Sequence, residues 1–387
     1  MSGTGPTLEV EWSILLTACS RSPAPEKLNR VKHLLQSPVR WQLLFARAER
    51  HGVLPLLYRA LGEFRDAVPK DQMNALKQGY ETNVHKAMLL SRELIRILGH
   101  LSEAGIQVMA YKGLALAEAL YGDIALRQSG DIDLLVRPRD FSRVRNALTQ
   151  LGYLPQASFS VTQENAYLKS GYECVFDGPA GRNLLEVQWA TLPGFYGVDF
   201  EMGSIFDRAV TVAVAGQKMK TPSPADLFLV LSMHAAKHVW GRLIWLCDIA
   251  RLMSVPELDW NWIGSAARQL GIVRILRVTM LVARGLLSER IPLEAERNFP
   301  EEAEALSVAE ETQSQIIGEV TVNVESLSYF RLMLRLRERR TDRLRFLSRL
   351  VFTPGPSEWE AVRLPRPLFP LYRLVRLSRL AARMVGG

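Results

Sequence analysis

Hydrophobic residues recur at spacings of three and four along the first hundred residues of the chain. The stretches 41–61 (WQLLFARAERHGVLPLLYRAL) and 83–101 (NVHKAMLLSRELIRILGHL) both follow this pattern, which is typical of amphipathic helices. Gly105 follows the second stretch, at a position where helices commonly end. We therefore expect residues 1–105 to form an N-terminal helical region.

The pattern changes in the middle of the chain. Apolar runs at 106–113 (IQVMAYKG) and 131–138 (DIDLLVRP) have the length of buried strands, and helical periods lie between and after them. Residues 172–190 (YECVFDGPAGRNLLEVQWA) hold two β-rich runs joined by Gly and Pro, which predicts a hairpin. We expect a small mixed α/β core over residues 106–220.

Helical periodicity returns after this core. Ser223 and Pro224 stand where an N-cap and a first helical residue are expected, with an acid soon after. We expect a helical domain over residues 221–328 and an arginine-rich segment over residues 329–387. The predicted fold class is α+β and mostly helical, with a small mixed sheet between N- and C-terminal helical regions.

Composition agrees with a globular protein in the cytoplasm. The chain has 387 residues, of which 48% are hydrophobic and 23% charged, and its length suggests about two to three structural units. No apolar stretch reaches the roughly 18 residues of a membrane span. The N-terminus lacks the basic and apolar pattern of a secretory signal. The three cysteines are far apart, so we expect them to be reduced and mostly buried.

Two aspartates stand one residue apart in the segment GDIDLLV, residues 130–136. On a strand, Asp131 and Asp133 project from the same face. Two carboxylates aimed at one point repel each other, and a divalent cation between them removes that repulsion. The pair is therefore a metal-site candidate, and the alternative is a solvent-facing strand end.

Groups suited to binding phosphate surround these aspartates. Lys112 and Gly113 stand at a predicted strand-to-helix turn, where free N–H groups and the helix dipole attract phosphate. The segment Arg127–Gly130 precedes the aspartate strand, and Arg127 and Ser129 can donate hydrogen bonds to phosphate oxygens. Glu186, on a predicted strand with Leu185, Val187 and Trp189 facing the other way, supplies a third carboxylate. Together these groups suit a metal-bound polyphosphate.

The order of these motifs resembles a known superfamily. The chain reads KG, a helix ending in Tyr-Gly, RQSGDIDLLV, a helix ending in LGY, and then a strand bearing an acid. This order is similar to the DNA polymerase β-like nucleotidyltransferase superfamily, and more narrowly to a group of bacterial uncharacterised nucleotidyltransferases. The segments HAAKHVW and LIWLCDIA, and the ending PLFPLYRLVR, also resemble that group.

The resemblance implies a function and a set of ligands. It implies transfer of a nucleoside monophosphate from a nucleoside triphosphate such as ATP to an acceptor hydroxyl, with two Mg²⁺ ions, or Mn²⁺, held by Asp131, Asp133 and Glu186. Lys112, Gly113, Arg127, Ser129 and Gly130 would then bind the phosphates. The acceptor stays open between tRNA, a protein, a peptide and a small alcohol.

This sequence departs from the superfamily at two positions. Leu114 follows Gly113 where a second glycine or a serine is usual, and Gln188 stands where a histidine often follows the third acid. The narrower group shares the Lys-Gly form of the turn. Any catalytic role of that histidine is absent from this chain.

Several other residues keep two interpretations. Lys237, His238 and Asp248 are candidates for lining the nucleotide or acceptor pocket, but Asp248 could instead be a buried partner of an arginine. Arg127 could likewise anchor its loop by pairing with an aspartate. His234 and His238 are four residues apart on one helical face, which is a metal-ligand spacing but more often reflects packing.

Positive charge is concentrated at the C-terminal end. Residues 331–383 hold fourteen arginines and four acids, against a net charge of +8 for the chain. This segment is a solvated face, or a contact to an acidic membrane, RNA or another polyanion. Two functions therefore compete with catalysis: a non-catalytic nucleotide- or polyanion-binding scaffold, and an RNA or membrane adaptor that uses this tail.

Overall fold

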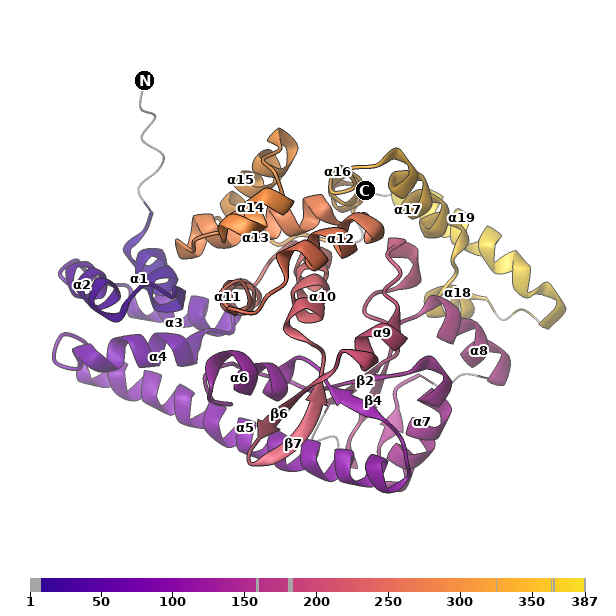
Figure 1. Ribbon diagram of the computed structural model, residues 1–387, viewed down its shortest axis with the longest axis horizontal. Coiled ribbons are helices and arrows are strands. Elements are labelled where there is room, and N and C mark those ends of the chain that lie inside the picture. The colour runs from indigo at the N-terminus through magenta and orange to yellow at the C-terminus, as the bar shows by residue number, and fades with distance from the viewer. Residues whose placement is uncertain are drawn as a thin grey trace.

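The computed structural model describes residues 8–157, 160–179, 184–324, 326–362, 364 and 366–385. The chain is mostly helical, with a five-stranded sheet and a separate two-stranded sheet (Figure 1). The predicted α+β class is confirmed. Part of the predicted hairpin loop, residues 180–183, lies outside the described residues.

The N-terminal region is helical, as its periodicity predicted. Its elements are α1 (Val10–Cys19), α2 (Ala24–Leu34), α3 (Trp41–Arg50), α4 (Leu54–Leu61), a 3₁₀ turn (Gly62–Phe64) and α5 (Lys70–Glu103). The helix expected at 83–101 is the C-terminal part of α5. This helix has 34 residues and is therefore about 50 Å long. It runs beneath both the N-terminal helices and the sheet (Figure 1).

The five-stranded sheet has the strand order β1-β2-β5-β4-β3. Strands β2 and β5 are parallel, and the other neighbouring pairs are antiparallel. The strands are β1 (Val108–Ala110), β2 (Ile132–Val136), β3 (Leu154–Pro155), β4 (Glu173–Asp177) and β5 (Leu184–Gln188). The predicted hairpin is the β4–β5 pair. The chain between β2 and β5 is long enough to cross back to the end of the sheet at which β2 begins. The two strands can therefore run parallel.

Alternation along β2 gives the two faces of the sheet different surroundings. Ile132, Leu134 and Val136 belong to a buried cluster that includes residues of α5 and α7. Leu135 belongs to a second cluster, which is formed mainly by helices, and Asp133 projects from the same face as Leu135. The helices of this unit are α6 (Gly113–Tyr121), a 3₁₀ turn (Pro138–Asp140), α7 (Phe141–Gln150) and α8 (Val161–Ser170).

The chain after β5 returns to helices through a small hairpin that the sequence pattern did not single out. The elements up to the hairpin are a 3₁₀ turn (Gly194–Tyr196), α9 (Met202–Asp207), β6 (Val210–Val214) and β7 (Gln217–Thr221). Residues of β7 contact β1, and residues of β6 contact α6. The hairpin therefore covers the β1 end of the sheet.

The remaining helices form the upper part of the molecule in Figure 1. They are α10 (Pro224–Lys237), α11 (Leu243–Leu252), α12 (Trp260–Leu270), α13 (Val273–Leu287), α14 (Leu293–Asn298), α15 (Ala303–Ile317), α16 (Leu327–Arg335), α17 (Arg340–Phe352), α18 (Pro356–Ala361), a 3₁₀ stretch (Arg366–Leu371) and α19 (Tyr372–Val385). The predicted start of α10 is confirmed, because the Ser223 hydroxyl accepts the N–H of Asp226 and Pro224 follows it.

The helices before and after the sheet bury their apolar side chains in one cluster. Trp12 of α1, Leu57 of α4, Trp240 and Ile275 all belong to it and are fully buried. The three cysteines are free and buried, as expected. No helix among the described residues is long and apolar enough to cross a bilayer.

We expect Leu134→Ala to lower the free energy of unfolding by about 2–5 kcal/mol, because it leaves a cavity in the central strand. Leu134 is fully buried, whereas Leu154 on the edge strand β3 is 61% exposed. Urea denaturation checks this, with Leu154→Ala as the matched control within about 0.5 kcal/mol of wild type. Equal effects of the two variants would contradict the described core.

A buried histidine makes stability depend on pH. His51 lies edge-on to Trp12, and its Nδ1 accepts the backbone N–H of Leu243 at 3.3 Å. Burial, and next the charge of Arg50, lower the pKa of His51 to about 4. The unfolded chain therefore binds the proton first, and stability falls as pH drops from about 6.5 to about 4.

We expect this group to account for about 3 kcal/mol of that loss. In His51→Gln, the change in unfolding free energy between pH 7 and pH 4 becomes smaller by about that amount. His85→Gln, at an exposed position on α5, is the control for replacing a histidine by glutamine. Urea denaturation at a series of pH values measures both, and parallel curves for wild type and His51→Gln would refute the assignment.

Candidate functional site

The turn between β1 and α6 has an unusual backbone that brings it close to the aspartate segment. Lys112 has φ +58° and Gly113 has φ +42°. A positive φ is unfavourable for lysine, so packing around the turn must hold it. A Cβ placed on Gly113 would lie 3.7 Å from the Asp131 carbonyl oxygen and 3.9 Å from Ser129 Oγ. The N-terminus of α6 thus faces the start of β2.

Strand pairing places the predicted acids on adjacent strands. Asp133 on β2 is the direct partner of Glu186 on β5, so their side chains project from one face. Asp131 lies one residue before β2. Leu185, Val187 and Trp189 belong to the buried cluster on the opposite face, as alternation along the strand predicted.

A lysine and a glutamine lie among these carboxylates. Lys112 Nζ is 3.0 Å from Asp133 Oδ1. The Gln188 amide donates to Asp133 Oδ1 at 3.3 Å, to Glu186 Oε2 at 3.1 Å and to Glu173 Oε2 at 3.3 Å. Sequence analysis missed Glu173. The register of the β4–β5 hairpin could have found it, because Glu173 pairs directly with Gln188.

The electrostatics of this cluster reflect crowded negative charge. Burial, and next the charge of Asp133, raise the pKa of Glu186. Burial and Asp133 also raise the pKa of Asp131. Burial, the largest single cause, would lower the pKa of Lys112, but Asp133, Tyr111 and Glu186 together outweigh it and the pKa is raised. The cluster therefore favours a cation at its centre.

The donor set suits a hard divalent cation by its chemistry, because it offers carboxylate oxygens from neighbouring strands. Within the described ranges, no three His, Cys, Asp or Glu side chains are placed to hold a metal ion together. Lys112 and Gln188 instead make the polar contacts to Asp133. The predicted ligand set of Asp131, Asp133 and Glu186 is therefore not assembled around one point in this structure.

The residues before β2 divide into two groups. Ser129 Oγ is buried and has no hydrogen-bond partner among the described residues, and it faces the Gly113 turn. An unpartnered buried hydroxyl is unfavourable, so Ser129 is available to a ligand. Arg127 points elsewhere, and its guanidinium donates to both carboxylate oxygens of Asp248 at 2.9–3.1 Å.

The pair of Arg127 and Asp248 connects the aspartate loop to the helical region. Both residues are buried, and the hydroxyl of Tyr121, at the end of α6, donates to Asp248 Oδ1 at 2.7 Å. This contact agrees with the second interpretation of Asp248, in which it is the buried partner of an arginine. Arg127 and Asp248 therefore position the loop that carries Ser129 and Asp131, and Arg127 does not project toward the Gly113 turn.

Lys237 and the two histidines lie at the end of α10. Lys237 Nζ is 3.2 Å from the hydroxyl of Tyr172, the residue before Glu173. Burial lowers the pKa of Lys237, and the charge of Glu173 opposes this, so Lys237 lies near the acid cluster. The rings of His234, His238 and Trp245 contact one another at centroid distances of 4.9–5.3 Å. These histidine contacts are packing contacts.

Comparison with models of protein families assigns this chain to a family. Residues 37–288 match the model of a family described as uncharacterised nucleotidyltransferases, which is more than half of the chain. The chain belongs to this family. The resemblance to a group of uncharacterised nucleotidyltransferases, noted in the sequence, is thereby confirmed. The match ends before the arginine-rich segment.

Other comparisons add little to this family assignment. No curated protein matches the chain significantly. Among solved structures, the antibiotic-resistance factor ANT(2'')-Ia in solution shows 16% identity, covering 53% of this chain and 95% of its own, with a TM-score of 0.29. A score this low carries no argument about the present protein.

Many of the C-terminal arginines of this protein contact other parts of the same chain. Arg337 is almost fully buried and donates to the carbonyl of Tyr196 at 2.9 Å. Others form ion pairs with acids, namely Arg335 with Glu304 and Glu311, Arg349 with Asp199, and Arg376 with Glu358. Part of the positive charge of the tail is thus neutralised within the fold.

We expect Asp248→Asn to lower the free energy of unfolding by about 3–5 kcal/mol, because it leaves the Arg127 charge buried without its partner. Asp199→Asn is the matched control, since Asp199 pairs with Arg349 at the surface, where ion pairs contribute about 0–1 kcal/mol. Urea denaturation compares the two. A loss no larger for Asp248→Asn than for Asp199→Asn would contradict the positioning role.

Proposed function

We propose that this protein transfers a nucleoside monophosphate from a nucleoside triphosphate to an acceptor hydroxyl, in a reaction that depends on Mg²⁺. The observation that supports this most is the juxtaposition of two partnered strand acids, Asp133 and Glu186, with the Lys112–Gly113 turn. A carboxylate cluster opposite a phosphate-binding turn is the arrangement that a metal-bound triphosphate requires.

In this proposal, the turn and the loop bind the triphosphate. The backbone N–H groups at the start of α6 and the Ser129 hydroxyl donate to phosphate oxygens. The Lys112 ammonium, which contacts Asp133, lies at the edge of this cradle and neutralises phosphate charge. These groups hold the phosphates in one orientation, so the acceptor can approach in line.

The acids act on the other side of the triphosphate. Asp131, Asp133 and Glu186 would hold Mg²⁺. When bound, Mg²⁺ supplies charge stabilisation for the phosphates and lowers the pKa of the acceptor hydroxyl. Gln188 keeps the carboxylates of Asp133 and Glu186 oriented by donating to both. Lys237 and Tyr172, next to Glu173, are candidates for the acceptor side of the site.

A second candidate function is a nucleotide-binding scaffold without catalysis. The contacts of Lys112 and Gln188 to the carboxylates favour it, because they compensate the negative charge without a metal. Such a scaffold would bind a triphosphate equally well with and without Mg²⁺. The enzyme binds it better with Mg²⁺.

We expect at least one nucleoside triphosphate with Mg²⁺ to raise the melting temperature of the wild-type protein, and a chelator to remove most of this shift. In Asp133→Asn the Mg²⁺-dependent part of the shift disappears, because a candidate ligand is lost. Asp177→Asn is the control, since Asp177 lies on β4 of the same sheet and is exposed. No shift with any triphosphate would refute nucleotide use.

Transfer itself is measured with α-labelled triphosphate and pools of RNA, protein and small alcohols as acceptors. We expect Asp131→Asn and Asp133→Asn to lower transfer by roughly 10²-fold or more, as for loss of a group that stabilises transition-state charge. Asp177→Asn retains wild-type transfer. Wild-type rates in both variants would exclude the proposed metal ligands.

A further inference from the structure

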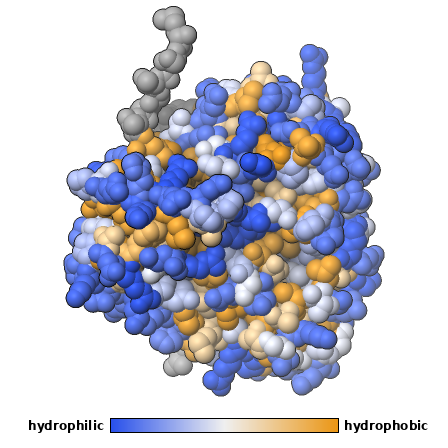
Figure 2. Space-filling model, turned by 60° about the vertical axis from the view of Figure 1, so that its left-hand side comes forward, coloured by the Kyte–Doolittle hydropathy of each residue, from blue (hydrophilic) through white to orange (hydrophobic). Residues whose placement is uncertain are grey.

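A cavity of about 680 Å³ lies away from the candidate site, on the side of the molecule that carries the N-terminal helices. It is open to solvent on one side and is lined by the loop after α1, by α2, by the end of α4, and by the ends of α6 and α11. Its volume falls in the range of about 300–1,000 Å³ that is typical of small-molecule sites. On this side of the molecule, hydrophilic side chains alternate with hydrophobic ones (Figure 2).

Helix α6 separates the cavity from the candidate site. Gly113 at its N-terminus faces the aspartate segment, whereas Ala119, Leu120 and Tyr121 at its C-terminal end line the cavity. Nine helical residues span about 13 Å. A ligand in this cavity is therefore distinct from one bound at the Lys112–Gly113 turn.

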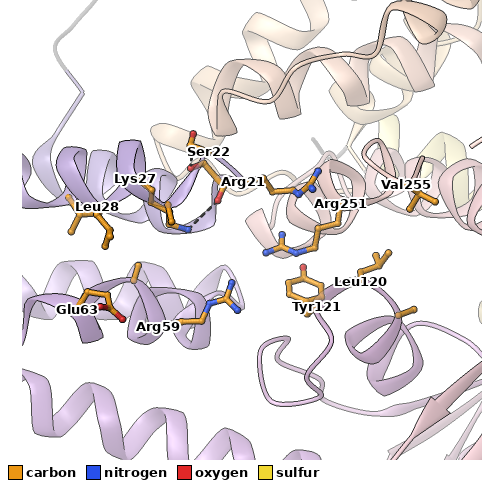
Figure 3. A pocket seen from close by; sticks show the side chains of 15 residues that line it. Arg21, Ser22, Lys27, Leu28, Arg59, Glu63, Leu120, Tyr121, Arg251 and Val255 are labelled. Atoms are coloured by element: carbon orange, nitrogen blue, oxygen red, sulfur yellow. Dashed lines mark hydrogen bonds between the residues drawn. The ribbon is translucent and has the colours of Figure 1, made fainter. Parts of the chain in front are cut away.

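Four cations line the cavity, and they come from four different segments. They are Arg21, Lys27, Arg59 and Arg251, and the acid that lines it with them is Glu63. Figure 3 shows Lys27 extending from the upper helix and Arg59 from the lower one, with Arg251 and Tyr121 across from them and Glu63 at the far end. The positive charges thus converge on one space.

Backbone carbonyls, not carboxylates, hold three of these cations. Lys27 Nζ donates to the carbonyls of Ala18 at 2.6 Å and Ser20 at 3.1 Å. Arg21 Nη1 donates to the carbonyl of Ala250 at 3.4 Å, and Arg251 Nη1 to that of Cys247 at 3.1 Å. Carbonyl contacts fix the side chains without cancelling their charge.

No ion pair joins any of these cations to a carboxylate among the described residues. Arg251 lies over the ring of Tyr121, with its guanidinium carbon 3.9 Å from the ring centre. Glu289 accepts the backbone N–H of Arg21 at 2.8 Å. Burial raises the pKa of Glu289, and the charges of Arg21, Arg251 and Lys27 oppose this rise, so Glu289 is a nearby counter-charge that forms no ion pair with them.

The cations also repel one another. Burial lowers the pKa of Lys27, and the charges of Arg59 and Arg251 contribute in the same direction. The four cations outnumber the two acids described near them, Glu63 and Glu289, so this space keeps an excess of positive charge that a bound anion would offset. Ser20 and Ser22 also line this space. The Ser20 hydroxyl donates to the Thr17 carbonyl at 2.9 Å, so the Ser22 hydroxyl is the one that can donate to an oxyanion.

We propose that this cavity is a second ligand site, which binds a small molecule carrying two or more phosphoryl charges. Arginine and lysine donors from several directions suit phosphate oxygens. The volume of about 680 Å³ suits a small molecule. Leu28, Val31 and Val255 form the apolar wall against which its carbon part would pack.

Isothermal titration with inorganic phosphate and with fructose 1,6-bisphosphate, used as probes, tests the site. We expect wild-type protein to bind the bisphosphate more tightly than phosphate, and Arg59→Glu to weaken binding at least tenfold. Arg65→Glu is the matched control, since Arg65 is also exposed, follows closely in the chain and does not line the cavity. We expect the bisphosphate affinity of Arg65→Glu to stay within twofold of that of wild type.

A double variant distinguishes binding in this cavity from binding at the Lys112–Gly113 turn. Lys112→Gln combined with Asp133→Asn replaces the ion pair of the candidate site by two neutral amides. We expect this protein to bind the bisphosphate as wild type does, and to lose that binding when Arg59→Glu is added. Absence of binding to wild type, equal binding by Arg59→Glu, or loss of binding in the double variant alone would each overturn the proposal.

Discussion

The parallel pairing of β2 with β5 brings Asp133 opposite Glu186, and the rest of the candidate site depends on this pairing. The two strands are separated in sequence by two helices and two further strands, so the contact forms only when the whole unit has folded. A buried carboxylate and a half-buried one in neighbouring positions repel each other. Lys112 and Gln188 offset that repulsion through a buried ion pair and a set of amide hydrogen bonds.

The turn at Lys112 and Gly113 is the second constraint. Its backbone is unfavourable for a lysine. Ser129 and Asp131 lie next to Gly113 and help to hold the turn in place. Strained residues of this kind are commonly retained where function needs them. Here the strain directs the lysine toward Asp133 and leaves the N–H groups of α6 facing the loop that precedes β2.

Periodicity was sufficient to predict the fold class and the position of each strand that carries an acid. The alternation of apolar and polar residues along 184–188 predicted the face of the sheet on which Glu186 lies. The apolar neighbours of Glu186 had to be buried on the opposite face. Contacts between elements that are far apart in the sequence could not be predicted. Asp248 and Arg127 are more than a hundred residues apart, and no local pattern shows that they pair.

The α8 helix and the β6–β7 hairpin were not predicted. They carry few buried apolar positions, so their period is weak and their local signals are capping and turn residues, such as Ser160 with Gln163 in the capping box before α8. Glu173 was missed for a related reason. The sequence predicted the hairpin but not its register, and the register is what pairs Glu173 with Gln188.

Helices from both ends of the chain bury side chains in the same apolar cluster, and this limits how the molecule can be dissected. A fragment cut near residue 105 or residue 221 would expose to water the surfaces of Trp12, Leu57 or Trp240 that now contact each other's helices. Such a fragment would aggregate before its chemistry could be assayed. The sheet and its acids therefore have to be studied in the intact polypeptide.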